Sequence, residues 1–286
     1  MPKILTAEQI EQYHRDGYVS PVRAFSAAEA QAYRARLEQS EREHGPLTVG
    51  QSGGGSKTHV LYTWADEIVR GSALLDAVED LIGPDILVYQ LTMWIKPARD
   101  DAIVDWHQDA SYFGLEPHEH VTAWIALTDA TSEAGCVRVI PGSHRQGVLH
   151  HSVRQGRARN MLPRGQSVST EFDARTAVEM PVRPGEFSLH HTLAVHGSEP
   201  NRSHDRRIGV GISYIPARVR FNGQARLSAK LVRGVDNYHH FDPEPRPQTD
   251  CDAASRAAHE RITRAYFASK QELAARYAAM KDSAAR

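Results

Sequence analysis

Hydrophobic residues between Ile86 and Pro216 recur with a period of two, and glycine or proline separates the successive segments. A period of two is typical of β-strands, because neighbouring side chains project to opposite faces of a strand. No helical pattern alternates with these segments, which argues against a parallel doubly wound sheet. The pattern predicts an antiparallel sandwich or jelly roll. The expected strands span 86–95, 104–108, 121–129, 136–140, 177–182, 186–191 and 207–216.

Helices are expected on both sides of this β-rich region. Thr6 with Gln9, and Ser26 with Glu29, fit the capping box, in which a hydroxyl and a Gln or Glu side chain each accept from a backbone N–H. The expected helices run from 6 to about 15, 26 to 44, 72 to 82 and 253 to about 280. We expect a single domain over 1–286, with a helical region (1–84), a jelly-roll core (85–220) carrying an insertion (150–182), and a C-terminal extension and helix (221–286).

Charge and composition exclude several partners. The chain has 34 Lys and Arg against 35 Asp and Glu, so it lacks the basic excess of a nucleic-acid binder. No apolar run approaches the roughly 20 residues that cross a bilayer, and the acidic, polar start lacks a signal peptide's apolar core. We therefore expect a cytoplasmic protein that binds neither membranes nor nucleic acid. With only two cysteines and 16 histidines, nitrogen and oxygen ligands would hold any metal.

The segment Trp106-His107-Gln108-Asp109 contains the first candidate metal ligands. In a strand, His107 and Asp109 share one face while Gln108 points away, so an imidazole and a carboxylate lie side by side. This pair is half of a facial metal site and needs a third ligand.

A second histidine-rich segment, residues 184–198, offers that ligand. His190 and His191 would face opposite sides of a regular strand, whereas His196 is followed by a glycine that lets the backbone approach a centre closely. In the strand that follows, Arg207 shares a face with Gly209, Gly211 and Ser213. An arginine aimed into a barrel is costly unless it meets an anion, and its fork suits a carboxylate.

Together these motifs resemble the phytanoyl-CoA dioxygenase family of iron(II)- and 2-oxoglutarate-dependent oxygenases. The resemblance covers most of the chain. It is carried by the opening Leu5-Thr-Ala-Glu-Gln9, Lys96-Pro97, Trp106-His-Gln-Asp109, Gly135-Cys-Val-Arg-Val-Ile-Pro-Gly-Ser-His144, His196-Gly-Ser198 and Arg207.

The resemblance implies a double-stranded β-helix, a jelly roll whose mouth holds the metal. It also implies roles for individual residues. It matches the iron ligands to His107, Asp109 and His196, the residue that holds the distal carboxylate of 2-oxoglutarate to Arg207, a cosubstrate-contacting hydroxyl to Ser198, and other cosubstrate positions to Gln90, Thr92 and Trp124.

Such a triad leaves one face of iron(II) open for 2-oxoglutarate and dioxygen. The expected reaction releases succinate and carbon dioxide and hydroxylates a substrate C–H bond; desaturation and ring closure are alternatives. Related halogenases lack the carboxylate that Asp109 supplies, so we expect no halogenation. The arginine-rich loop 150–182 is interpreted as a solvated loop, with the alternative that one or two of its arginines meet an anionic substrate group while the glycine-rich segment around Gly53 closes as a lid. Because the loops are rich in arginine and lack an extended apolar run, we expect a small or medium polar metabolite as substrate. The loop arginines are Arg154, Arg157, Arg159 and Arg164.

Two other function classes stay open. One is a metalloenzyme on a cupin-type barrel that does not use 2-oxoglutarate, although such an enzyme gives Arg207 no reason to face inward. The other is a non-catalytic barrel that binds a small molecule. Oligomeric state is also open. Tyr112 and Phe113 either line the substrate pocket or pack the strand end. Seven further histidines are interpreted as loop or turn residues: His118, His120, His144, His150, His151, His239 and His240.

Overall fold

The computed structural model describes residues 2–49, 54–153, 159–162 and 166–284. Its α-helices are α1 (Ala7–Asp16), α2 (Ala27–His44), α3 (Thr63–Val69), α4 (Ser72–Ile82), α5 (Ala110–Phe113) and α6 (Ala253–Ala284). Short 3₁₀ helices are η1 (Thr58–Val60), η2 (Ser143–Gln146) and η4 (Ala174–Thr176). Its strands are β1 (Tyr18–Arg23), β2 (Ile86–Lys96), β3 (Val104–His107), β4 (Leu115–Glu116), β5 (Val121–Ala126), β6 (Val137–Val139), β7 (His151–Val153), β8 (Gln166–Val168), β9 (Val178–Met180), β10 (Glu186–His191), β11 (His196–Ser198), β12 (Arg207–Pro216), β13 (Arg220–Phe221), β14 (Ser228–Arg233) and β15 (Asp242–Pro243).

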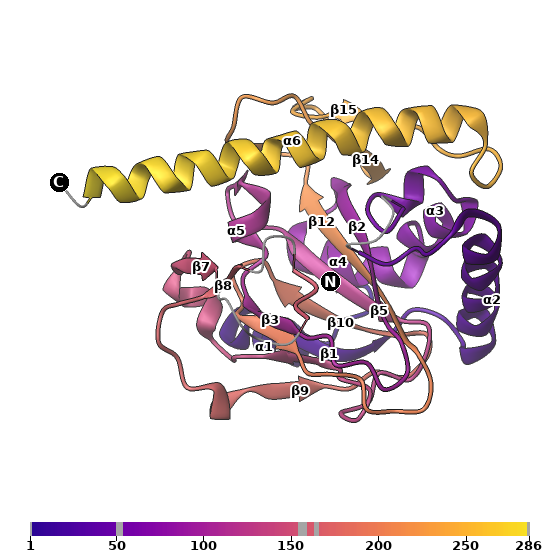
Figure 1. Ribbon diagram of the computed structural model, residues 1–286, viewed down its shortest axis with the longest axis horizontal. Coiled ribbons are helices and arrows are strands. Elements are labelled where there is room, and N and C mark those ends of the chain that lie inside the picture. The colour runs from indigo at the N-terminus through magenta and orange to yellow at the C-terminus, as the bar shows by residue number, and fades with distance from the viewer. Residues whose placement is uncertain (1, 50–53, 154–158, 163–165, 285–286) are drawn as a thin grey trace.

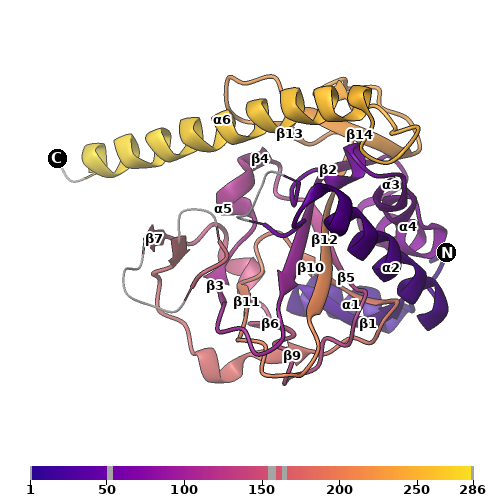
Figure 2. The same cartoon turned by 45° about the vertical axis from the view of Figure 1, so that its right-hand side comes forward.

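Two sheets form the centre of the molecule. The larger has the order β1-β10-β5-β12-β2-β14-β15 and is antiparallel except for β14 with β15; the smaller has the antiparallel order β3-β11-β6-β9. Helices α2, α3 and α4 lie on one side of the larger sheet, and the smaller sheet lies on the other (Figures 1 and 2). Helix α6 runs across the top of the molecule, and its C-terminal end extends beyond the strands. This arrangement matches the mainly β jelly roll with flanking helices that the sequence predicts.

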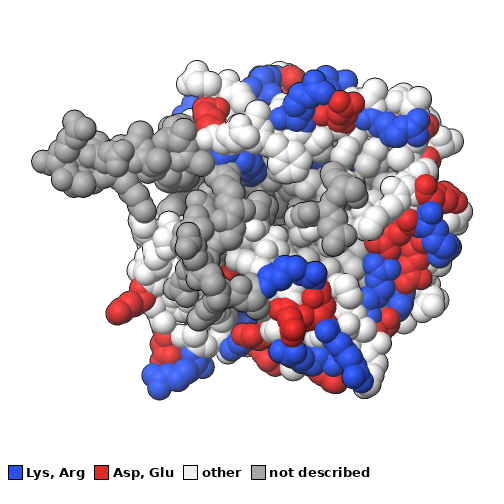
Figure 3. All heavy atoms as spheres, in the orientation of Figure 1, with Lys and Arg blue, Asp and Glu red and all other residues white. Residues whose placement is uncertain are grey.

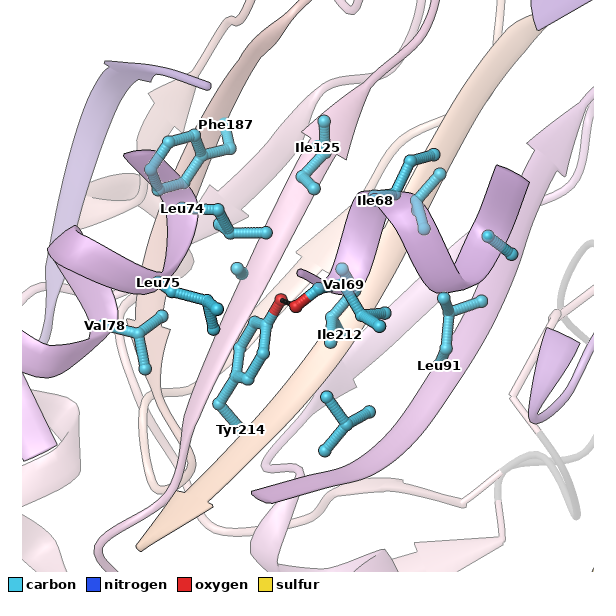
Figure 4. Packing of buried hydrophobic residues seen from close by; sticks show 14 of the residues in the cluster. Ile68, Val69, Leu74, Leu75, Val78, Leu91, Ile125, Phe187, Ile212 and Tyr214 are labelled. Atoms are coloured by element: carbon cyan, nitrogen blue, oxygen red, sulfur yellow. Dashed lines mark hydrogen bonds between the residues drawn. The ribbon is translucent and has the colours of Figure 1, made fainter. Parts of the chain in front are cut away.

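The alternation of side chains along β12 explains why the larger sheet has two different faces. Ile208, Val210, Ile212 and Tyr214 belong to the core formed with the helices. Figure 4 shows this packing, in which the Tyr214 hydroxyl donates to the carbonyl oxygen of Val69 at 3.0 Å. The odd-numbered residues of β12 therefore face the other way, into the space between the two sheets.

Two glycines on that inner face make room for indole rings. A Cβ atom at Gly209 would lie 1.9 Å from Cζ2 of Trp124, and one at Gly211 would lie 2.8 Å from Nε1 of Trp94. Real side chains do not approach so closely, so the small residues of β12 are required by the tryptophans of β5 and β2. The indoles in turn form walls of the interior.

Both predicted capping boxes are present, at Thr6 and Ser26. Strands β1 and β14 and helices α3 and α5 were not expected from the sequence. Strand β1 contains Pro21, which argues against a strand in sequence, but β1 is at the edge of the larger sheet, where proline is tolerated. The insertion 150–182 is not a plain loop, because β7 pairs with β8 and β9 pairs with β6 within the described residues.

Candidate metal and cosubstrate centre

Antiparallel pairing brings two distant histidines together. His107 ends β3, His196 begins β11, and the two are directly paired in register. Their ring centroids lie 4.1 Å apart. Asp109 follows β3 at the start of α5, and its Oδ1 lies 3.6 Å from Nε2 of His107 and 3.8 Å from Nε2 of His196. One donor atom from each of the three residues lies within 4.8 Å of the others, and no further such group occurs among the described residues.

Hydrogen bonds orient the donor atoms of this triad. Nδ1 of His107 donates to the carbonyl oxygen of Asp105 and Nδ1 of His196 donates to that of Ala194, both at 2.9 Å. Because a carbonyl oxygen only accepts, each Nδ1 carries a proton, and in the neutral ring this leaves the lone pair on Nε2. Thr122 Oγ1 donates to Asp109 Oδ2 at 2.6 Å, which leaves Oδ1 toward the imidazoles. These outer contacts are of the kind that position metal ligands.

The charges of the triad suit a divalent cation. Burial lowers the pKa of His196 well below its usual value, so its imidazole is neutral at pH 7. Burial works against ionisation of Asp109, yet contacts with His107 and His190 hold the pKa of this carboxyl well below its ordinary value. Two neutral imidazoles and one carboxylate are the donor set of iron(II) oxygenase sites, and they fit that metal without any thiolate.

Arg207 lies in the same small cavity as the triad, together with Ser198 and Trp124. The arginine side chain is buried, with its guanidinium 5.1 Å from the centre of the Trp124 ring. Nη1 donates to the carbonyl oxygen of Gly135, while Nε has no hydrogen-bond partner, and no carboxylate among the described residues pairs with this cation. Burial lowers its pKa to about 10, so it stays charged at neutral pH. A buried, incompletely paired guanidinium is the feature expected of a carboxylate-binding site.

Lys96, part of the Lys96-Pro97 motif, also belongs to this centre, although the sequence predicted no role for it. Its fully buried ammonium donates to Ser198 Oγ at 2.8 Å. Burial, and then the charge of Arg207, lower the pKa of Lys96 to about 6. Because the Ser198 oxygen accepts from Lys96, the hydroxyl proton of Ser198 is available to another acceptor in the cavity. The sequence signal was a lysine at the end of an otherwise apolar strand.

Gln90 and Thr92 lie elsewhere. They line a second, larger cavity, which also reaches His107 and Asp109 but does not include Arg207. The Gln90 Oε1 atom accepts from the backbone of Leu91 at 3.2 Å. The structure therefore groups Trp124 with the candidate cosubstrate residues, and it groups Gln90 and Thr92 with the neighbouring space.

Gln108 points away from the triad, as the strand alternation predicts. Its Nε2 donates to the carbonyl oxygens of Gly147 and Leu193, and its Oε1 accepts from the backbone of Leu149. The central residue of the His-Gln-Asp motif thus ties together the loops on either side of the two histidine strands.

Strand β10 ends in two further histidines, of which only His190 lies close to the triad. His190 is buried on β10, with Nε2 3.6 Å from Asp109 Oδ2, and neither of its ring nitrogens has a hydrogen-bond partner. His191 faces the opposite side, as expected, and packs against His144. The interpretation of His120 as a surface-loop residue was wrong, because its side chain is completely buried against Phe113. Pro117, which suggested a surface loop, is itself exposed, and the chain becomes buried again at His120.

The structure describes one of the four arginines predicted in the loop 150–182. Arg159 is paired with Asp100 and lines the larger cavity. Arg154, Arg157, Arg164 and Gly53 lie outside the described residues. Tyr112 and Phe113 both line the larger cavity, which favours the first of the two interpretations of this pair.

A sequence model of the phytanoyl-CoA dioxygenase (PhyH) family matches residues 13–209, which is more than half of the chain and includes every candidate site residue. The chain belongs to the PhyH family. As a PhyH protein it is an iron(II)- and 2-oxoglutarate-dependent oxygenase, in agreement with the class that the sequence predicts. Among the described residues, no helix is both long and apolar enough to span a bilayer.

Known relatives and structures agree with this assignment. The L-proline trans-4-hydroxylase of Streptomyces griseoviridis is 30% identical over 225 residues, which cover 71% of this chain and 84% of the relative. The non-heme monooxygenase ThoJ is 33% identical in its apo structure, with a TM-score of 0.83 over 94% of this chain and 99% of that one, and it has also been solved as a nickel complex. CytC3 with Fe(II) and alpha-ketoglutarate shares the fold, with a TM-score of 0.63 at 22% identity over 84% of this chain and 93% of that one.

Proposed function

We propose that this PhyH protein binds iron(II) through His107, Asp109 and His196 and hydroxylates a small molecule at the expense of 2-oxoglutarate and dioxygen. The observation that carries the proposal is the meeting of three metal-type donor atoms within 4.8 Å beside a buried arginine that lacks a carboxylate partner. A cupin-type metalloenzyme without 2-oxoglutarate would need the triad but would have no use for this cation.

Three residues of the small cavity, together with Lys96, which contacts one of them, bind the cosubstrate in this proposal. Arg207 holds the distal carboxylate of 2-oxoglutarate through Nε and Nη, and Ser198 donates its hydroxyl proton to the same group. Lys96 fixes the Ser198 oxygen so that this proton points into the cavity. Trp124 supports the flat face of the guanidinium. When bound, iron(II) supplies the redox chemistry that couples decarboxylation of 2-oxoglutarate to insertion of one oxygen atom into a C–H bond.

The protein's remaining contribution is positioning and exclusion of water. The larger cavity reaches His107 and Asp109, so a substrate there presents a C–H bond to the open side of the triad. The burial of both imidazoles keeps bulk water away from the reacting atoms. Asp109 fills the third ligand position with its own carboxylate, which favours hydroxylation, desaturation or ring closure over halogenation.

The decisive experiment compares Asp109→Ala with the control Asp101→Ala, which removes a neighbouring but exposed carboxylate. Anaerobic titration measures iron(II) affinity, and succinate release from 2-oxoglutarate measures turnover. We expect Asp109→Ala to bind iron(II) more than about tenfold more weakly and to lose succinate release, while the control behaves as wild type. Undiminished binding and turnover in Asp109→Ala would overturn the ligand assignment.

A further inference from the structure

The larger cavity is the feature that most restricts the substrate. Its volume is about 1050 Å³, at the upper end of the roughly 300–1,000 Å³ of small-molecule sites. Its wall is contributed by strand β2, helix α5 and the C-terminal helix α6, and its floor reaches two of the triad residues. A small amino acid would fill only a minor part of this space and would leave the rest to water.

Most of the surface of the wall is apolar, and five aromatic side chains contribute to it. They come from three separate elements, namely Trp94 on β2, Tyr112 and Phe113 on α5, and Tyr266 and Phe267 on α6. Phe267 is 45% exposed, unusual for a phenylalanine, because it borders this open space. Covering such a surface with a polar metabolite gains little, whereas an apolar molecule removes aromatic area from water.

The cationic side chains of the wall already have partners within the protein. Arg206 forms two hydrogen bonds with Glu41, at 2.7 and 3.0 Å. Arg159 pairs with Asp100. The Lys270 ammonium donates to the Tyr112 carbonyl oxygen and lies 4.2 Å from the ring centre of Tyr266. A charged substrate would have to compete with these contacts, and the three cations disfavour a positively charged one.

The surface charges seen in Figure 3 also do not favour a strongly charged substrate. On the face shown, basic and acidic residues are interspersed among the described residues, and neither sign gathers into a field that would steer a strongly charged substrate.

We propose that the substrate is a bulky, largely apolar and uncharged ring-bearing molecule, held between the aromatic side chains of α5 and those of α6. This proposal rests on the function proposed above and names its substrate class. It differs from the polar metabolite that the arginine-rich loop suggested, because the one described arginine of that loop that lines the cavity, Arg159, is bound to Asp100.

The test uses the full chain loaded anaerobically with iron(II) and 2-oxoglutarate. The probe is N-phenyl-1-naphthylamine, a neutral aromatic dye whose fluorescence rises in apolar sites. Competitors are progesterone, a neutral tetracyclic ketone, and L-proline, a small zwitterion. The variant Phe267→Ser removes an aromatic side chain from the wall, and Phe267→Trp keeps one. Tyr238→Ser is the matched control, because Tyr238 is an aromatic residue that is 54% exposed outside the cavity.

We expect the dye to bind the wild type, to be displaced by progesterone and to be unaffected by L-proline. Phe267→Ser should weaken dye binding on the order of tenfold, while Phe267→Trp and Tyr238→Ser retain it. Equal affinities in Phe267→Ser and Tyr238→Ser, no dye binding, or displacement by L-proline would each overturn the substrate class.

A separate absorption measurement distinguishes failure of the proposed substrate class from failure of the proposed function. The visible charge-transfer absorption of 2-oxoglutarate on iron(II) is recorded on the wild type before dye is added. Absorption without the expected dye binding refutes the substrate class alone. Its absence refutes the function, whatever the dye does.

Discussion

Arg207 and Lys96 are buried basic side chains inside the barrel, and neither has a salt-bridge partner among the described residues. Burial lowers the pKa of Arg207 to about 10 and that of Lys96 to about 6, which reflects the cost of keeping charge away from water. Folds retain such groups where an anion compensates them during function. A buried basic side chain without a salt-bridge partner therefore indicates the cosubstrate site more clearly than the metal ligands do.

Replacing Arg207 tests this idea. Arg207→Met should weaken 2-oxoglutarate binding by at least about tenfold, because a charge-assisted contact is lost, while iron(II) affinity stays unchanged. The melting temperature of the cosubstrate-free protein should remain equal or rise, since an uncompensated buried charge is removed. Arg202→Met, which alters an exposed arginine paired with Asp101, is the control. A fall in melting temperature without loss of 2-oxoglutarate affinity would assign Arg207 a structural role.

Strand β12 connects the core to the site through its two faces. One face packs isoleucine, valine and tyrosine against α3 and α4, and the other presents Arg207 followed by two glycines. The glycines admit Trp124 and Trp94 into the interior, so the strand positions the guanidinium and at the same time shapes the surfaces around it. Packing and cosubstrate binding are consequently linked within one element.

A methyl group at Gly209 should disturb both properties. Gly209→Ala places a Cβ 1.9 Å from Trp124 Cζ2, and the indole must move. We expect the free energy of unfolding to fall by about 1–3 kcal/mol, and 2-oxoglutarate affinity to fall with it because the support of Arg207 shifts. Urea denaturation measures the first effect and ligand titration the second. Combining the change with Trp124→Leu should recover part of the stability; strictly additive losses would contradict the proposed contact.

Several histidines in different parts of the molecule are partly or fully buried and neutral at pH 7. Burial lowers the pKa of His120 to about 3 and those of His151 and His191 to about 4. In the unfolded chain each would titrate near its ordinary value of about 6.5. Between these limits the unfolded chain binds more protons than the folded protein, so stability is full above about pH 6.5 and is lost as the pH falls toward 4.

Urea denaturation of the iron-free protein at pH 7.5 and pH 5 measures this dependence. We expect a lower free energy of unfolding at pH 5, and a smaller difference in His191→Asn. His239→Asn changes an exposed histidine and should keep the wild-type dependence. Identical pH dependence in the two variants would show that His191 is not among the groups responsible.

The capping boxes, the two-residue alternation of the strands and the opposite directions of Gln108 and its neighbours were predictable from the sequence. Each depends on residues within a few positions of one another, where backbone geometry dictates which side chains share a face. Strand β1 escaped prediction because the tolerance of Pro21 depends on its edge position, which is a property of the assembled sheet.

The triad shows which contacts a local sequence pattern can predict and which it cannot. His107 and Asp109 are only two residues apart, but β3 ends at His107 and Asp109 lies at the start of α5, so their proximity follows from this strand-to-helix turn, whereas His196 meets them through the pairing of β11 with β3. The contact of Lys96 with Ser198, the place of His190 behind Asp109 and the aromatic cavity wall depend in the same way on elements that are remote in the chain. Pairing register and helix docking arise from the summed packing of the entire fold, and no short stretch of residues encodes them.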